Sequence, residues 1–149
     1  LGLSAEHGCF IRKPRSDDWE NLAARTDMSW QKDVMDIFQH FTERTQGSFI
    51  ERKRVALTWH YRRADPEYGA FQAKECRKQL EETVMKRYDV EVMSGKANLE
   101  VRPTFVNKGN IASRLVREFA EPPDFVLCLG DDFTDEGRQS SGVFYMGFR

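Results

Sequence analysis

A run of five apolar residues, Phe125 to Leu129, stands before an acidic segment and most constrains the fold of this chain. Because no polar residue alternates within the run, it predicts a strand buried on both faces, as in a parallel sheet. Four carboxylates follow within residues 131–136, where that strand ends. Ligands of open α/β sheets bind at the carboxyl ends of strands. The pattern therefore predicts α/β structure with either a site for a hard cation or a solvated acidic turn at this point.

Composition limits the class of protein. The chain has 149 residues, enough for one ordinary domain or for a small core with an insertion. Its 23 basic and 24 acidic residues give a net charge of −1, which argues against nucleic-acid binding driven by bulk charge. No apolar run approaches the about 20 residues of a membrane helix, and the first residues show no signal-peptide pattern. Three widely spaced cysteines form neither a zinc motif nor a disulfide framework. We therefore expect a cytoplasmic protein that binds neither nucleic acid nor membranes.

The middle of the chain, residues 29–103, has the pattern of an α+β unit. Apolar residues at helical spacing follow Ser29, a candidate N-cap, and Asp65 with Pro66 marks a second helix start. The charged residues 51–54 are either a hairpin tip or a polar patch in one long strand. The expected elements are a helix that carries Trp30 to Phe41 and is ended by Gly47, β structure over 48–62, a helix from Pro66 to about Lys86, and strands around 90–92 and 99–101.

The flanking segments have a different pattern. Residues 1–12 resemble core strand, and the polar segment 14–27 has Trp19 and Leu22 as candidate anchors. A helix after Lys108 leads by a short link to the apolar run, which is typical of α/β structure, and residues 143–146 are a candidate further strand. We expect an α/β core over 1–28 and 104–149, interrupted by an α+β insertion over 29–103. Because the chain lacks an initiator Met, we expect it to be a segment of a longer one.

Lys108 and the acidic segment lie at the two ends of this helix–strand unit. A lysine ammonium can hold a phosphate or the carboxylate of a nucleophile, and carboxylates can hold Mg²⁺. Together they would neutralise the charge of a transferring phosphoryl group. A lysine at a helix start is also compatible with a merely solvated position, so the pairing with the acids is what points to phosphoryl chemistry.

Several segments together resemble the trehalose-6-phosphate phosphatase family of the haloacid dehalogenase superfamily. Residues 130–136 with 107–109 would by themselves indicate only the superfamily. The resemblance spans residues 1–136 and is closest to the fungal form, a phosphatase domain at the end of a longer chain. The segments are Leu3–Gly8, Val55–Asp65, Leu99–Pro103, Asn107–Gly109 and Gly130–Glu136.

The resemblance implies a haloacid dehalogenase-like Rossmannoid core with an inserted α+β cap. It also implies a Mg²⁺-dependent phosphatase that converts trehalose 6-phosphate to trehalose and phosphate through an aspartyl-phosphate intermediate. Lys108 matches the lysine that binds the phosphate and the nucleophile. Asp131 matches the acid that ligates Mg²⁺, and Asp135 matches an acid that supports the metal shell. The role of Asp132 stays open.

The insertion matches a cap that closes over the sugar. Glu51, Lys53 and Glu100 match cap residues that hydrogen-bond sugar hydroxyls, and Glu100 faces away from its apolar strand neighbours. Arg62 is a further candidate for substrate binding. Solvated positions are the alternative for all four, and Arg102 is expected to be an exposed strand arginine or a ligand contact. Four other residues are expected to be structural: His7, His60, Trp59 and Tyr61.

The sequence departs from the family at the nucleophile. The family carries it in an Asp-x-Asp-Gly-Thr segment, which does not occur here, and Asp17–Asp18 has the wrong spacing. We therefore expect the nucleophile to lie outside this segment. The alternatives are a non-catalytic phosphatase-like domain that regulates or binds within a trehalose-synthesis complex, and a related phosphatase acting on another sugar, such as sucrose phosphate. Retained Lys108 and Asp131 favour the enzyme, and a trehalose-6-phosphate synthase complex is the expected partner.

Overall fold

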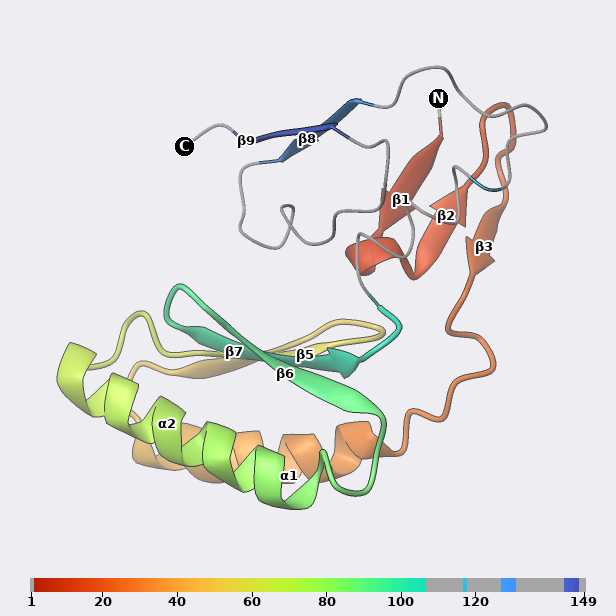
Figure 1. Ribbon diagram of the computed structural model, residues 1–149. Coiled ribbons are helices and arrows are strands. Elements are labelled where there is room, and N and C mark those ends of the chain that lie inside the picture. The colour runs from red at the N-terminus through yellow and green to blue at the C-terminus, as the bar shows by residue number, and fades with distance from the viewer. Residues whose placement is uncertain (1, 107–116, 118–126, 131–143, 148–149) are drawn as a thin grey trace. The chain divides into compact units, whose positions relative to one another are not determined.

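The computed structural model describes residues 2–106, 117, 127–130 and 144–147 (Figure 1). The chain divides into two compact units, Leu1–Thr104 and Phe105–Arg149. The expected division into 1–28, 29–103 and 104–149 stays a prediction.

The first unit begins with a three-stranded antiparallel sheet, in the order β1-β2-β3. The expected anchoring by Trp19 is wrong, because its side chain is 46% exposed. Backbone pairing secures this segment instead: Trp19 lies opposite Arg12 in the sheet, and the Leu22 N–H donates to the Cys9 carbonyl at 2.8 Å. The elements are β1 (Leu3–Ala5), the 3-10 helix η1 (Glu6–Gly8), β2 (Phe10–Arg12) and β3 (Trp19–Asn21).

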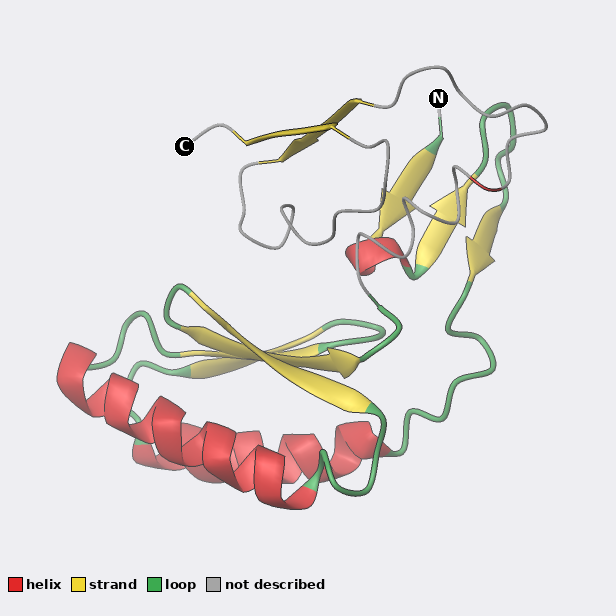
Figure 2. Ribbon diagram, in the orientation of Figure 1, coloured by secondary structure: helices red, strands yellow, loops and turns green. Residues whose placement is uncertain are grey.

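The rest of the unit is a four-stranded antiparallel sheet, in the order β4-β5-β7-β6, with both helices on the same side of it (Figure 2). Of the charged residues 51–54, Glu51 and Arg52 end β4, and Lys53 and Arg54 lie in the hairpin tip, where the Lys53 N–H donates to the Ala56 carbonyl at 3.0 Å. The expected order of helices and strands over 29–103 is thus confirmed. The elements are α1 (Trp30–Arg44), β4 (Phe49–Arg52), β5 (Leu57–His60), α2 (Pro66–Thr83), β6 (Val90–Gly95) and β7 (Asn98–Pro103).

The two helix starts differ. At α2, the Asp65 carboxylate accepts from the Tyr68 N–H at 2.8 Å, and proline fills the first helical position, as expected. At α1, Ser29 occupies the N-cap position, as expected, but its side chain makes no capping bond. Its N–H and hydroxyl both donate to Asp27 at 2.8 Å, and these two bonds lower the pKa of the Asp27 carboxyl. A serine in front of an apolar helical pattern predicts a capping bond. The pattern does not show that the Asp27 carboxylate binds both the N–H and the hydroxyl of Ser29.

The apolar core lies between this sheet and the helices. Leu57 and Trp59 on β5 point toward the helices and are fully buried, and the Trp59 indole donates to the Thr42 hydroxyl at 3.1 Å. Trp59 is therefore part of the core, as predicted. Burial raises the pKa of Cys76 on α2 to about 12, so this thiol stays neutral and packs as a small apolar side chain.

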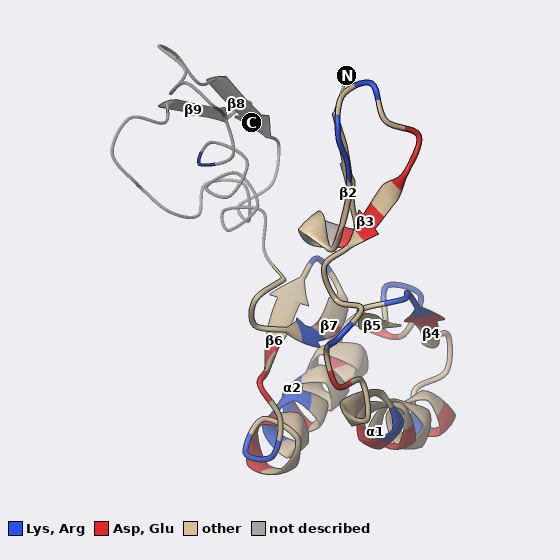
Figure 3. Cartoon of the chain, turned by 90° about the vertical axis from the view of Figure 1, so that its right-hand side faces the viewer, with Lys and Arg blue, Asp and Glu red and all other residues tan. Residues whose placement is uncertain are grey.

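Charged residues of both signs are interspersed along α1 and α2, the helices of the first unit (Figure 3). Within the described ranges, neither helix combines the length and apolarity that a bilayer crossing requires. The outer surfaces of both helices thus carry charges of both signs, although Tyr68 and Phe71 of α2 are also exposed, and the buried apolar sides of the helices pack in the core.

In the second unit, β8 (Leu127–Gly130) pairs in parallel with β9 (Phe144–Gly147). Leu127 to Leu129 of the apolar run thus lie in a strand with a parallel neighbour, as the lack of alternation in the run predicted. This neighbour overlaps the candidate strand at residues 143–146. The helix expected after Lys108 and the acidic segment 131–136 lie outside the described residues.

Core packing gives a first prediction. Leu80 on α2 is fully buried in the cluster beneath the sheet. Leu80→Ala should lower the free energy of unfolding by about 2–5 kcal/mol, because it removes apolar burial and leaves a cavity. Urea denaturation measures this loss. The control is Leu3→Ala, whose side chain is 38% exposed; equal losses for the two variants would contradict the core assignment.

Candidate functional site

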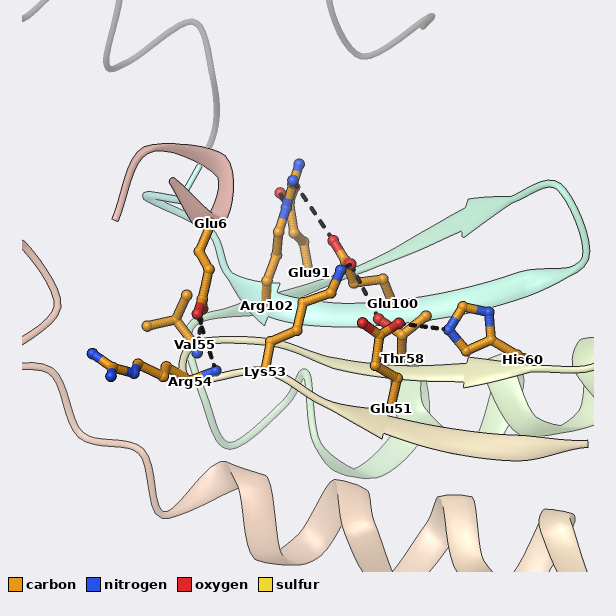
Figure 4. A network of polar contacts seen from close by, with 10 residues as sticks. All are labelled: Glu6, Glu51, Lys53, Arg54, Val55, Thr58, His60, Glu91, Glu100 and Arg102. Carbon is orange, nitrogen blue, oxygen red and sulfur yellow. Dashed lines mark hydrogen bonds and ion pairs between the residues drawn. The ribbon is translucent and has the colours of Figure 1, made fainter. Parts of the chain in front are cut away.

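The sheet face opposite the helices carries the polar side chains of four strands. Successive residues of a strand point to opposite faces. Since Leu57 and Trp59 point into the core, Thr58 points away from it. The register places Glu51 and Glu100 on either side of Thr58 in the neighbouring strands. We call this surface the polar face (Figure 4), and its residues are Glu51, Lys53, Thr58, His60, Glu91, Glu100 and Arg102.

Glu100 is held at the centre of the polar face. Its Oε2 accepts from the Lys53 ammonium at 2.9 Å and from the Thr58 hydroxyl at 3.1 Å. The side chain of Glu100 is only 13% exposed, and that of Lys53 is 30% exposed. Because both donors belong to the β4–β5 hairpin, this carboxylate ties the hairpin tip to the central strand β7.

Glu51 is the more accessible acid. Its Oε2 lies 2.8 Å from His60 Nε2, and its side chain is 47% exposed. The His60 ring stacks on Phe49, with centroids 4.7 Å apart and planes inclined by 17°. The carboxylate thus has a fixed partner on one side and stays open to a ligand.

Arg102 is buried, so the expectation of an exposed strand arginine is wrong. It pairs with Glu91 directly opposite on β6, and its Nε donates to the Glu91 carboxylate at 2.9 Å. Its guanidinium also lies 3.9 Å from the other oxygen of Glu100. The register of β6 on β7 supplies the carboxylate of Glu91, and Glu100 on the same strand as Arg102 supplies a second one, which together allow the guanidinium to be buried.

The chemistry of the polar face suits a neutral ligand with many hydroxyls. Among the described residues it carries three carboxylates, Glu51, Glu91 and Glu100, against the cations of Lys53 and Arg102. Carboxylates accept hydrogen bonds from hydroxyls, and the Lys53 ammonium donates them. This excess of negative charge disfavours a phosphate in the same place.

Arg62 is not brought into this group. It is exposed beyond the end of β5, and its guanidinium donates to the Lys96 carbonyl at 3.4 Å, in the turn between β6 and β7. Lys53 lies near the opposite end of β5, in the hairpin tip that follows β4. In the described contacts, Arg62 therefore has no link to the polar face.

The other predicted site residues, Lys108, Asp131 and Asp135, lie outside the described residues. In the part of the chain that the structure describes, no three His, Cys, Asp or Glu side chains gather closely enough to hold a metal ion. The structure thus brings together the sugar-directed candidates Glu51, Lys53 and Glu100, and leaves the phosphate-directed candidates as predictions.

Two residues of the N-terminal segment, Glu6 and Phe10, contact the β4–β5 hairpin tip. The Glu6 carboxylate accepts from the backbone N–H groups of Val55, at 3.0 Å, and Arg54, at 3.4 Å. The Arg54 guanidinium lies over the Phe10 ring, 5.4 Å from its centre.

Burial and, secondarily, the Glu6 charge raise the pKa of Cys9 to about 11, so this thiol is no nucleophile at neutral pH.

Sequence reasoning missed Thr58 and Glu91 as parts of this site. Alternation within β5 could have placed Thr58 on the same face as His60, because the two are separated by one residue. Their contact with Glu100 and Glu51 depends on which strands pair and in what register. That information is not local, and only the folded sheet supplies it.

Comparison with known proteins gives a consistent match. A family model described as trehalose-phosphatase matches residues 1–141. A trehalose-phosphatase of Schizosaccharomyces pombe is 62% identical in an alignment of 138 residues, which covers 91% of this chain and 17% of that protein. The chain therefore spans about a sixth of the length of this curated relative.

Solved structures agree. A trehalose-6-phosphate phosphatase structure of Aspergillus fumigatus matches at 73% identity and a TM-score of 0.76, over 99% of this chain and 60% of that one. The C-terminal domain of a Candida albicans trehalose-6-phosphate phosphatase matches at 63% identity and a TM-score of 0.83, over 91% of this chain and 50% of that one. The match to the Aspergillus fumigatus structure covers both units of the chain.

The polar face gives a second prediction. Arg102→Leu should lower the free energy of unfolding by about 1–3 kcal/mol, because Glu91 and Glu100 lose a buried donor. The control is Arg77→Leu on α2, where the guanidinium pairs with Glu81 at the surface; its loss should be about 0.5 kcal/mol or less. Chemical denaturation of both variants measures the difference, and a loss for Arg102→Leu no larger than the control would contradict its structural role.

Proposed function

The chain belongs to the trehalose-phosphatase family, and on that basis we propose that it forms part of an enzyme that hydrolyses trehalose 6-phosphate to trehalose and phosphate. Its fold class is the one expected from the sequence, a partial α/β domain of haloacid dehalogenase type. One observation carries the proposal: the residues expected to bind sugar hydroxyls, Glu51, Lys53 and Glu100, lie together on the polar face.

We assign sugar recognition to this face. The carboxylates of Glu51 and Glu100 accept hydrogen bonds from hydroxyls, while the Lys53 ammonium donates. The contact between Lys53 and Glu100 at 2.9 Å holds both groups before a ligand arrives. Groups already fixed lose little entropy on binding, so they can orient the reacting end of the substrate efficiently. A ligand without the matching hydroxyls would leave these polar groups unpaired and would bind poorly.

We propose that Lys108 and the acidic segment act on the phosphate. The acidic segment follows Gly130, the last residue of β8, and thus the carboxyl end of a parallel strand. Carboxylate oxygens there are the ligands that Mg²⁺ prefers, so Asp131 and Asp135 are the proposed residues that hold it. When bound, Mg²⁺ would neutralise phosphoryl charge, and Lys108 would hold the phosphate.

The covalent step belongs to groups outside this segment. We propose that an aspartate there attacks phosphorus to form an aspartyl phosphate, and that a second acid protonates the leaving sugar oxygen. Water then hydrolyses the intermediate. A trehalose-6-phosphate synthase complex is a proposed partner on the resemblance alone.

The test is phosphate release from trehalose 6-phosphate by the longest natural chain that contains this segment, with and without Mg²⁺. We expect Mg²⁺-dependent release, with glucose 6-phosphate and sucrose 6-phosphate as poor substrates. A folded protein that binds trehalose 6-phosphate without releasing phosphate would instead support the non-catalytic regulatory domain. Preference for sucrose 6-phosphate would assign a related sugar phosphatase.

Lys108 gives a third prediction. In that longer chain, Lys108→Ala should lower kcat by about 10³-fold, because phosphoryl charge loses a fixed cation. Steady-state kinetics with trehalose 6-phosphate measure the loss, and the unfolding midpoint should stay close to that of the wild type. Lys78→Ala, an exposed lysine on α2, is the matched control. Normal turnover of Lys108→Ala would remove its assigned role.

Glu51 gives a fourth prediction. Glu51→Ala should raise KM and lower kcat for trehalose 6-phosphate, with a loss in kcat/KM of about tenfold, because the sugar loses a positioning contact. The control is Glu75→Ala, an exposed acid on α2. If both variants keep wild-type kinetics, Glu51 is only a solvated residue of the hairpin.

A further inference from the structure

The contact between His60 and Glu51 has no role in the function proposed so far. We propose that His60 is a positioning residue, which holds the Glu51 carboxylate in place for the sugar, and that Phe49 in turn holds His60. This inference rests on the proposed sugar-binding role of Glu51. It differs from the expectation that His60 only supports the fold.

Glu51 needs such a partner more than Glu100 does. Glu51 lies on β4, an edge strand of the sheet, and its side chain is 47% exposed. Glu100 lies on β7 within the sheet, is 13% exposed, and is held by Lys53 and Thr58. A free glutamate side chain would lose conformational entropy when a ligand fixes it. A hydrogen bond formed in advance reduces that cost.

The geometry fits a donor from His60. A carboxylate only accepts hydrogen bonds, so the 2.8 Å contact with Glu51 Oε2 requires the proton on His60 Nε2. A bond to a charged acceptor is stronger than a neutral one. Since His60 engages Oε2, the second oxygen of Glu51 and its lone pairs are directed elsewhere and can accept from a sugar hydroxyl.

The His60 ring is itself fixed. Phe49 and His60 lie directly opposite each other on β4 and β5, and their rings stack at 4.7 Å. The side chain of His60 is 23% exposed, whereas Phe49 is 48% exposed. Stacking on the imidazole ring of His60 gives a reason for the large, exposed phenyl ring of Phe49. The three residues thus form a chain of support from Phe49 through His60 to Glu51.

The test uses the longest natural chain and separates the ring from the hydrogen bond. His60→Phe keeps a ring to stack on Phe49 but has no N–H, and His60→Gln places an amide N–H at a similar reach. His60→Phe should raise KM for trehalose 6-phosphate about fivefold, while His60→Gln should stay within about twofold of the wild type. The control is His40→Phe, an exposed histidine on α1, which should leave KM unchanged.

A double-mutant cycle distinguishes positioning from a general structural effect. If His60 acts through Glu51, then His60→Phe should change KM little in a Glu51→Ala background. Phe49→Leu is a second, independent variant, and it should raise KM about twofold with an unchanged unfolding midpoint.

The outcomes separate the two proposals. If the wild type hydrolyses trehalose 6-phosphate but His60→Phe leaves KM unchanged, or if its effect multiplies fully with that of Glu51→Ala, the positioning role is overturned and the proposed function stands. If the wild type neither binds nor hydrolyses trehalose 6-phosphate, both are overturned. If it binds without hydrolysis, the same cycle is measured on Kd, and the same fivefold change is expected.

Discussion

The two-residue period of one antiparallel sheet underlies both the stability and the proposed recognition surface of this chain. In the register of β4, β5, β7 and β6, one set of side chains, including Trp59, is buried against the helices. The alternate set, including Thr58 and Glu100, forms the polar face. A slip of one residue would exchange the two sets, exposing the core and burying carboxylates. The packing of the core therefore fixes the strand register, and the register in turn fixes the positions of Glu51 and Glu100 on the polar face.

Long-range polar contacts then set the positions of individual groups. The ion pair between Lys53 and Glu100 joins residues 47 apart in the sequence, one at a hairpin tip and one on a central strand. Both are partly shielded from water, which strengthens their attraction but also makes their desolvation costly. The Thr58 hydroxyl and the nearby Arg102 guanidinium supply further stabilisation to Glu100. The result is a surface whose donors and acceptors are arranged before any ligand is present.

Local patterns predicted the elements well and the side-chain environments less well. Helical spacing after residue 29 and the Asp65–Pro66 start were enough to predict both helices, and alternation showed that Glu100 faces away from the core. The errors have one cause in common. Trp19 and Arg102 were each assigned from neighbours in sequence, whereas their environments depend on a paired strand and an opposing glutamate. The roles of Glu51 and Lys53 came from resemblance, because a run of charges at a hairpin does not by itself indicate a ligand.

The attachment of the hairpin tip has a consequence for how freely its sequence can change. Glu6 binds the backbone N–H groups of Arg54 and Val55 and not their side chains. Every residue except proline carries that N–H. The exposed Arg54 side chain beside Lys53 can therefore change without loss of this anchor, whereas proline at either position, or the loss of Glu6 itself, would weaken it. Val55 is buried, so variation in shape or charge next to the sugar-directed lysine falls on position 54 and not on position 55.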